Sequence, residues 1–461
     1  MPAAGMSGHE RNGSAPRPPL PRSVIVYYSL PHLVHAVVTL PMALFIPSYY
    51  ADELALPLAA VGTAMAASRL LDVVVDLLIG VASDRLYTRW GRRKPWIALG
   101  TPVLMLATWM VFVPPPAVSP IYLLVWSGLL FLGFTLVDLP HKAWGAELST
   151  DYTERTHVAG WREGFGALGQ IGFLVLLLGL DWTGHGDARS QLMAIGLTIV
   201  VALPILVAVS LARTPEFPPD DWSEGPRGLA ALRLIIANRA FIRTVGTLLL
   251  FGSAVLIQAT LHRIVLTHVV GRADLFTPMI LAENLASLAA IPIWIGLSHR
   301  IGKHRAITLA SLWVGLWSLG LPWIGQGDVV PYIALIVLRG SSLASIFLLA
   351  NAIAADVVDH DLLVSGRQRT GLFFAVWAVA IKLAVALGVL LATALPAAFG
   401  FEPSAPSNTP EAKQWLMTLY GWLPCVIMAL GAPLMWNFPI DRNRQRALRD
   451  EIDTRRRPTP G

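Results

Sequence analysis

The sequence is poor in charged residues and has almost no cysteine. Only 14% of its 461 residues are Asp, Glu, Lys or Arg, whereas soluble domains have roughly 25%. This shortage of charge excludes an ordinary water-soluble enzyme. The one cysteine, Cys425, excludes a disulfide framework and a zinc site built from several cysteines. The sequence also lacks a P-loop, a nucleophile elbow and His/Cys metal spacing, so we expect neither catalysis nor a cofactor.

Apolar residues are abundant and gather in long runs. They make up 55% of the chain, and a helix needs about 20 of them in sequence to cross a hydrocarbon core of about 30 Å. We therefore predict an all-α membrane protein with twelve transmembrane helices. The twelve runs cover residues 24–49, 58–83, 96–113, 120–144, 161–180, 191–212, 241–266, 276–298, 306–325, 331–355, 371–399 and 414–438.

Basic residues indicate the orientation, because cytoplasmic loops are enriched in Lys and Arg. With both termini inside, 28 of the 35 basic residues lie in the tails, the inner loops and the adjoining helix ends, and three lie deep inside predicted helices. The outer loops and the adjoining helix ends hold the other four: Arg189, Arg263, Arg272 and Lys413. We expect both termini in the cytoplasm and, from the residue usage, a bacterial inner membrane. The basic residues do not gather on one polar face, so we expect no nucleic-acid partner.

A Pro-rich, charged stretch divides the chain into two halves. We expect a disordered cytoplasmic tail (1–22), a first six-helix bundle (23–212), a cytoplasmic linker (213–240), a second six-helix bundle (241–438) and a basic cytoplasmic tail (439–461). A glycine and arginine pattern between helices two and three has a fainter echo between helices eight and nine, as in carriers built from repeated halves. We expect a monomer whose partners are membrane lipids and a small solute.

Charged side chains inside a membrane are costly and therefore indicate function. Arg69, Asp72 and Asp76 are spaced i, i+3 and i+7, so they share one face of the second predicted helix. Two carboxylates can hold a hard cation or a proton; the alternative is a static ion-paired contact between the bundles. Lys382 has no partner nearby in the eleventh helix. We expect it to pair with these carboxylates across the bundle interface.

The fourth predicted helix ends in a second polar group. Asp138 can complete the cation site or hold a substrate hydroxyl, and Lys142, four residues later, can bind substrate or only shield Asp138. Trp144 offers a flat face on which a sugar ring can stack, although tryptophans also serve as interfacial anchors. Elsewhere, Glu283 and Arg339 can pair with each other.

Together these residues resemble a known transporter family. The stripe from Arg69 to Asp76, the loop RWGRRKPW over 89–96, Asp138-Leu-Pro, and R-x-R-x-G-L-F-F before Lys382 are similar to the glycoside-pentoside-hexuronide:cation symporters, melibiose carriers above all. These belong to the major facilitator superfamily. The resemblance implies two six-helix bundles that carry a small solute together with Na⁺, Li⁺ or H⁺. It also implies that the two span-two aspartates hold the cation and that Asp138 contacts sugar.

The solute half of the site departs from the melibiose-carrier pattern. Ala36, beside His35, replaces the aspartate that grips sugar hydroxyls, and Lys142 replaces the stacking tryptophan. Melibiose carriers have an arginine at the start of the fifth helix. Here Arg162 matches it, or the arginine is displaced by one place and Glu163 stands at the matching position. A pocket that has lost a carboxylate and gained an amine suits a carboxylated sugar or organic acid. A lysophospholipid-like cargo and a receptor or scaffold with a transporter fold remain alternatives. The candidate substrate residues are His35, Asp138, Lys142, Trp144, Arg162 and Trp377.

We expect coupled binding to drive the cycle. A cation between Asp72 and Asp76 would release Lys382 and order the solute site, and solute would strengthen cation binding by the same factor. Only the doubly loaded or the empty carrier would then cross readily. The inner loop between helices two and three is expected to pair with the second bundle and to latch the outward-facing state. Its gating residues are Asp84, Arg85, Arg92 and Arg93.

Overall fold

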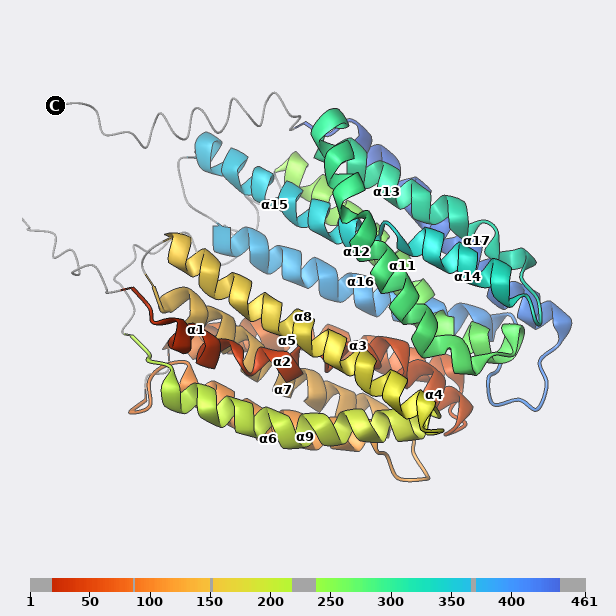
Figure 1. Ribbon diagram of the computed structural model, residues 1–461, viewed down its shortest axis with the longest axis horizontal. Helices are drawn as coiled ribbons and strands as arrows, with labels where there is room; N and C mark the ends of the chain where they lie inside the picture. The colour runs from red at the N-terminus through yellow and green to blue at the C-terminus, as the bar shows by residue number, and fades with distance from the viewer. Residues whose placement is uncertain (1–18, 86–87, 150–151, 218–237, 366–369, 440–461) are drawn as a thin grey trace, which may run out of the picture.

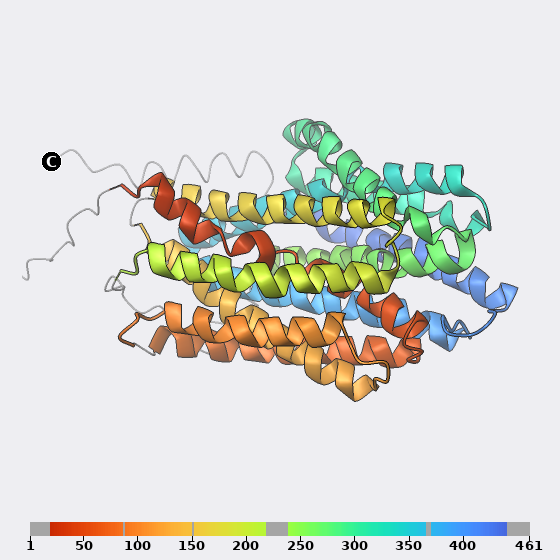
Figure 2. The ribbon, with the colours of Figure 1, turned by 60° about the horizontal axis from the view of Figure 1, so that its bottom comes forward.

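The computed structural model describes residues 19–85, 88–149, 152–217, 238–365 and 370–439. Within them, twelve helical stretches are long and apolar enough to cross a membrane, which confirms the predicted number of crossings. The helices run side by side along the longest axis of the molecule (Figures 1 and 2). Many apolar side chains on them, such as Leu78, Ile121 and Ile293, are exposed, as expected for helix faces in contact with lipid.

The first half contains spans one to six. Its helices are α1 (Arg22–Ser29), α2 (His32–His35), α3 (Thr39–Leu44), α4 (Ile46–Asp52), α5 (Leu58–Arg85), α6 (Lys94–Phe112), α7 (Pro120–Glu147), α8 (Tyr152–Trp182) and α9 (Ala188–Arg213). α7 packs along both α5 and α6, and α9 packs along α6. Gly133 permits a close approach of α7 to α6, because a Cβ there would lie 2.5 Å from the backbone nitrogen of Leu104.

The first span is broken, which corrects the single helix predicted over 24–49. Four short helices, α1 to α4, stand in its place. Prolines account for the breaks, because proline lacks an N–H and its ring clashes with the preceding turn. Pro31 lies at the start of α2, Pro41 lies in α3, and Pro47 lies in the first turn of α4. The interrupted backbone places the α2 side chains next to α7 and α8.

The second half contains spans seven to twelve. Its helices are α11 (Arg239–Val265), η1 (Leu266–Val270, a π-helical turn), η2 (Ala273–Leu275), α12 (Phe276–Ile301), α13 (Lys303–Ser318), η3 (Leu321–Trp323), α14 (Val329–Gly340), α15 (Leu343–Ser365), α16 (Thr370–Ala398) and α17 (Pro410–Trp436). α11 packs against α16 and α17, and α17 packs against α13. α14 and α15 form one span with a break, where the sequence predicted continuous helix over 331–355.

The two halves meet mainly along α5 and α16. Gly62 of α5 makes this contact close, because a Cβ there would lie 1.5 Å from Oγ1 of Thr393. We call the end of the molecule at which α1 begins and α17 ends the proximal end, and the opposite end the distal end (Figure 1). At the distal end a further contact joins the halves: Nε2 of His268 lies 2.7 Å from Oδ1 of Asp52.

The helix boundaries are compatible with the predicted division of the chain. α9 ends at Arg213 and α11 begins at Arg239, on either side of the predicted linker. Residues 218–237 of that linker lie outside the described residues, as do 1–18 and 440–461 of the two predicted tails.

Candidate cation and solute sites

A four-charge group joins α5 to α16 near the middle of the spans. Nζ of Lys382 lies 2.8 Å from Oδ2 of Asp72 and 2.5 Å from Oδ2 of Asp76. Nη1 of Arg69 lies 3.6 Å from Asp72 on the same helix. Only 1% of the Asp72 side chain is exposed, so this carboxylate depends on its two cationic neighbours for stabilisation. The predicted contact of Lys382 with the span-two carboxylates is confirmed.

Thr135 of α7 completes this group. Its Oγ1 lies 2.9 Å from Oδ1 of Asp72 and 2.8 Å from Oδ1 of Asp76. The guanidinium of Arg69 stacks over the ring of Phe131, one turn earlier on α7, at 3.6 Å. α7 therefore supplies an oxygen beside both carboxylates and a ring that fixes the arginine. Lys382 thus contacts one oxygen of each aspartate, and Thr135 contacts the other oxygen of each.

A second polar group surrounds Asp138 of α7. Nζ of Lys142 lies 2.7 Å from Oδ2 of Asp138, and Nη2 of Arg162, on α8, donates to Oδ1. Nδ1 of His35 lies 3.9 Å from Oδ1. Three of the predicted solute residues, His35, Lys142 and Arg162, are thus gathered around the fourth.

Two charged side chains of this group are open to solvent. The Lys142 side chain is 56% exposed and that of Glu163 is 69% exposed, although both lie within spanning helices. A charge exposed at membrane depth is stable only where it meets water. We infer that α7 and α8 present these two groups to a water-filled space.

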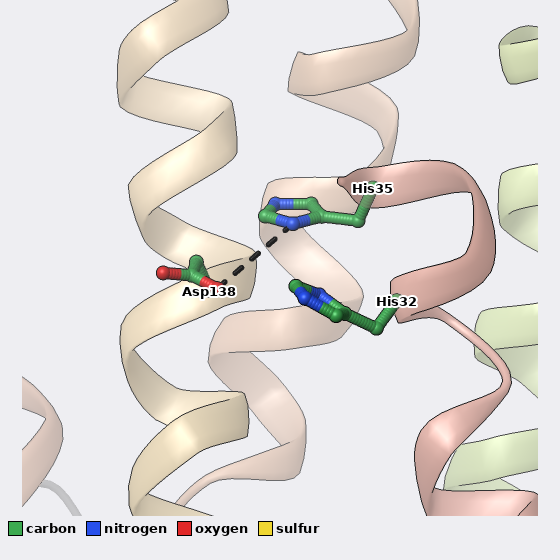
Figure 3. A group of neighbouring side chains, drawn as sticks. All are labelled: His32, His35 and Asp138. Carbon is green, nitrogen blue, oxygen red and sulfur yellow. Dashed lines mark ion pairs between the residues drawn. The ribbon is translucent and has the colours of Figure 1, made fainter. Parts of the chain in front are cut away.

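The group also contains a candidate metal cluster. Ring nitrogens of His32 and His35 and a carboxylate oxygen of Asp138 lie within 4.8 Å of one another, and Figure 3 shows both rings on the side of Asp138 that faces α2. Both Asp138 oxygens already pair with the cations of Lys142 and Arg162. A divalent ion would bring further positive charge against the same carboxylate, so these residues do not favour a resident metal.

The two predicted tryptophans are both buried. Trp144 is fully buried, and its Nε1 donates to the backbone oxygen of Pro215 at 2.9 Å. Its ring packs edge-on against Tyr28. Trp377 is buried in the core of the second half. In this conformation neither ring has an open face on which a solute could stack.

The predicted gating arginines pair within the first half in this structure. Arg92 and Arg93 both contact Glu147 of α7, and their backbone N–H groups donate to Glu216, just beyond α9. The side chains of Asp84 and Arg85 lie outside the described part of the chain. The predicted pairing of this loop with the second half, in an outward-facing state, stays a prediction.

Sequence reasoning did not single out Thr135 or His141. Both lie three residues from Asp138 on α7, and i and i+3 positions share a helix face. Applying that spacing to Asp138 would have found them. The predicted pairing of Glu283 with Arg339 is confirmed by the structure.

Comparison with known proteins identifies the family. Residues 27–442 match the family described as MFS/sugar transport protein. The chain belongs to this family. Membership makes the protein a multi-pass membrane transporter of the major facilitator superfamily rather than an enzyme, and it agrees with the resemblance to glycoside-pentoside-hexuronide:cation symporters.

Several curated relatives are similar along most of their length. The glucuronide carrier protein homolog of Escherichia coli (strain K12) is 24% identical, with 94% of this chain and 96% of the relative covered. The sodium-dependent lysophosphatidylcholine symporter 1 of Homo sapiens is 25% identical, with 84% and 78% covered. The names of these relatives refer to different cargoes at nearly equal identity, so identity alone does not choose the solute.

Solved transporter structures share the fold. The crystal structure of D-xylose-proton symporter has a TM-score of 0.65 at 13% identity and covers 90% of this chain and 97% of that one. A bacterial homolog of the human lysosomal transporter Spinster also has a TM-score of 0.65 at 13% identity, with 95% and 98% covered. The predicted fold class, twelve helices in the major facilitator arrangement, is therefore confirmed.

Proposed function

We propose that the protein is a cation-coupled symporter, in a bacterial inner membrane, of a small solute that carries a carboxylate, such as a uronate-like sugar derivative. The observation that carries the proposal is the position of Lys382. This ammonium comes from the second half and lies between the two carboxylates of α5 in the first half. It occupies the place in which a coupling cation would be stable.

Coupling follows from competition for those carboxylates. A Na⁺ ion or a proton that binds at Asp72 and Asp76 neutralises negative charge that attracts Lys382. The ion pair between the two halves therefore weakens. The same α7 helix contributes Thr135 to the cation group and Asp138 to the solute group. A shift of α7 on cation binding therefore reaches the solute site, and the coupling is reciprocal.

The exposed ammonium of Lys142 supports an anionic solute. It is the more exposed member of its pair with Asp138, so a solute carboxylate can reach it without breaking the contact of Arg162 with Asp138. The similarity to a glucuronide carrier homolog over nearly the whole chain supports the same class. Glu163, which is also exposed, can accept hydrogen bonds from hydroxyl groups of the solute.

The test measures solute uptake by proteoliposomes in which the purified protein has been reconstituted. We expect labelled methyl glucuronide to accumulate under a Na⁺ or proton gradient and methyl glucoside to accumulate much less. Asp76→Asn should abolish accumulation and leave downhill exchange. Accumulation by Asp76→Asn equal to that of the unmodified protein would contradict the cation assignment.

A charge variant tests the solute class. Lys142→Ala removes a charge-assisted hydrogen bond and should raise KM for the glucuronide about tenfold. Lys413→Ala, at the start of α17, serves as the control. Equal KM values for Lys142→Ala and the unmodified protein would remove the support for an anionic solute.

Lysophosphatidylcholine belongs in the same uptake panel because of the symporter relatives that carry it. Cation-driven uptake of this lipid, with none of the glucuronide, would replace the solute class and keep the coupling proposal.

A further inference from the structure

We propose that His141 is a positioning residue that fixes the guanidinium of Arg162 in the solute site. The inference rests on the proposed function, because it assigns Arg162 to solute binding. It adds a residue for which neither the sequence motifs nor the comparisons provide a role.

His141 is held on both sides. It is 2% exposed and its ring stacks on Tyr28 at 4.3 Å with an interplanar angle of 14°. Nε2 lies 2.8 Å from the backbone oxygen of Tyr28, and the Tyr28 hydroxyl donates to the backbone oxygen of His141 at 2.9 Å. α1 and α7 therefore clasp each other through this pair.

The carbonyl of Tyr28 determines which ring nitrogen of His141 carries the proton. A carbonyl oxygen only accepts, so Nε2 must carry the hydrogen. In the neutral ring Nδ1 then has a lone pair, and it lies 3.3 Å from Nε of Arg162. The arginine always donates, so the bond runs from Arg162 to His141. A doubly protonated ring would place an N–H against the guanidinium and lose this bond.

The bond to His141 gives a partner to the third nitrogen of the Arg162 guanidinium, Nε. Nη2 of Arg162 donates to Asp138 and Nη1 donates to Glu163 at 2.5 Å. Nε is directed at His141, and the arginine as a whole is 4% exposed. With all three edges occupied, the plane of the guanidinium is fixed relative to α7. Without His141, Nε would be a buried donor without a partner, and the group could turn toward the exposed Glu163.

The break in the first span makes this arrangement possible. Pro31 interrupts the helix, because its ring clashes with the preceding turn. Tyr28 lies in the last turn of α1, where the carbonyl groups have no partner within the helix. Its carbonyl is available to a side chain from α7. The proline thus acts on the solute site through Tyr28 and His141.

A purely structural role for His141 and a positioning role predict different rankings of the same variants by severity. If His141 only packs against Tyr28, His141→Phe keeps the ring stack and should be the milder change. If His141 positions Arg162, His141→Asn is milder, since its amide oxygen can occupy the place of Nδ1 and accept from Arg162. His141→Gln keeps a donor near Nε2 and should resemble His141→Phe.

The transport test compares these variants for methyl glucuronide uptake in proteoliposomes. We expect His141→Phe and His141→Gln to raise KM about tenfold, the value of one hydrogen bond to a charged group, with maximal rates changed much less. His141→Asn should lie closer to the unmodified protein. A KM for His141→Phe at or below that of His141→Asn overturns the proposal.

A stability test separates this inference from the proposed function, because it needs no solute. Melting temperatures in detergent are measured for His141→Phe, Arg162→Lys and the double variant. Lysine lacks the Nε–H, so His141→Phe should lower the melting temperature less in the Arg162→Lys protein than in the unmodified one. Additive effects would overturn the contact. If the effects on melting temperature are non-additive but no glucuronide is taken up, the contact between His141 and Arg162 is supported and the proposed solute class is refuted.

Discussion

The hydroxyl of Thr135 lies within hydrogen-bonding distance of two carboxylates, yet it has one proton to donate. It can donate to Asp72 or to Asp76, but not to both at once. The second contact becomes a hydrogen bond only when that carboxyl group is protonated and donates to the threonine oxygen. A bound metal cation would instead use the lone pairs of all three side chains. Either form of loading stabilises the group that Thr135 bridges.

Replacing Thr135 should therefore weaken coupling. Thr135→Val keeps the shape of the side chain and removes the oxygen, which costs about 1.5–3 kcal/mol for a hydrogen bond to a charged group. We expect the cation concentration, or the proton concentration, for half-maximal uptake to rise at least tenfold. Thr135→Ser keeps the oxygen and is the control. If Thr135→Val and Thr135→Ser show the same cation dependence, the hydroxyl has no part in coupling.

At the scale of residues, the charges were easier to predict than their neutral partners. Asp72, Asp76 and Lys382 stand out because a charge in an apolar run is costly. Thr135 and His141 are compatible with many helix positions, so their roles depend on which helices meet. Trp144 shows the same limit, since its burial depends on the packing of Tyr28 and Pro215 against α7.

Close contact between α2 and α8 holds the histidines of the first span next to the solute site. A Cβ added to Gly169 of α8 would lie only 1.7 Å from the backbone oxygen of Leu33. The neighbour is backbone, which cannot turn aside as a flexible side chain could. The two helices can approach this closely only with glycine at this position.

Gly169→Ala should consequently separate α2 from α8. We expect a loss of about 1–3 kcal/mol in stability, the usual cost of overpacking, seen as a lower melting temperature in detergent and weaker solute uptake. Gly172→Ala is the matched control on the same helix, because nothing lies within 4 Å of a Cβ there. Similar losses in both variants would show that α8 tolerates no alanine for reasons other than this contact.

At the scale of elements, hydropathy was enough to predict the number of spans. Whether each span is one continuous helix depends on its prolines, which should have been given more weight. The runs of apolar residues predicted twelve crossings, because length and composition determine whether a helix can span the membrane. The first run contains Pro31, Pro41 and Pro47, and each was a reason to expect a broken helix. The break between α14 and α15 has no proline, but it follows Gly340 and includes Ser341 and Ser342. Gly/Ser pairs also kink helices, so this signal was missed.

The distal end of the molecule is closed by an arginine as well as by the pair of Asp52 and His268. Arg263 of α11 is 9% exposed, and its Cζ lies 5.0 Å from the ring centres of both Phe45 and Phe276. Nη1 donates to Gln191 of α9 at 3.3 Å. A cation of the second half thus lies between rings from both halves and bonds to the first half. Alternating access requires these contacts to break.

Arg263→Gln should make the distal end open more often. Loss of one or two kcal/mol from the closed state corresponds to roughly a 5- to 30-fold rise in the open population. The measurement is the labelling rate of Val389→Cys, on α16, by a membrane-impermeant maleimide in a Cys425→Ser protein. Arg272→Gln is the control, because Arg272 pairs with Asp274 in its own half. An unchanged labelling rate in Arg263→Gln would show that other contacts keep this end closed.

The fold of the whole molecule followed from the sequence, whereas its conformational state did not. Twelve apolar runs and a central linker are properties of composition. Which end is closed depends on small differences between contacts such as those of Arg263, which the sequence suggested only as a loop residue on the outer side.

The ammonium of Lys382 also has an electrical consequence. Asp72, Asp76, Arg69 and Lys382 carry two negative and two positive charges, so the group is neutral when no cation is bound. The empty carrier can therefore return through the membrane without moving charge against the voltage. A bound cation adds one positive charge, and a carboxylated solute cancels it. Transport of such a solute with one cation should generate no current, whereas a neutral solute would be driven by membrane potential; uptake under potassium diffusion potentials set with valinomycin distinguishes the two.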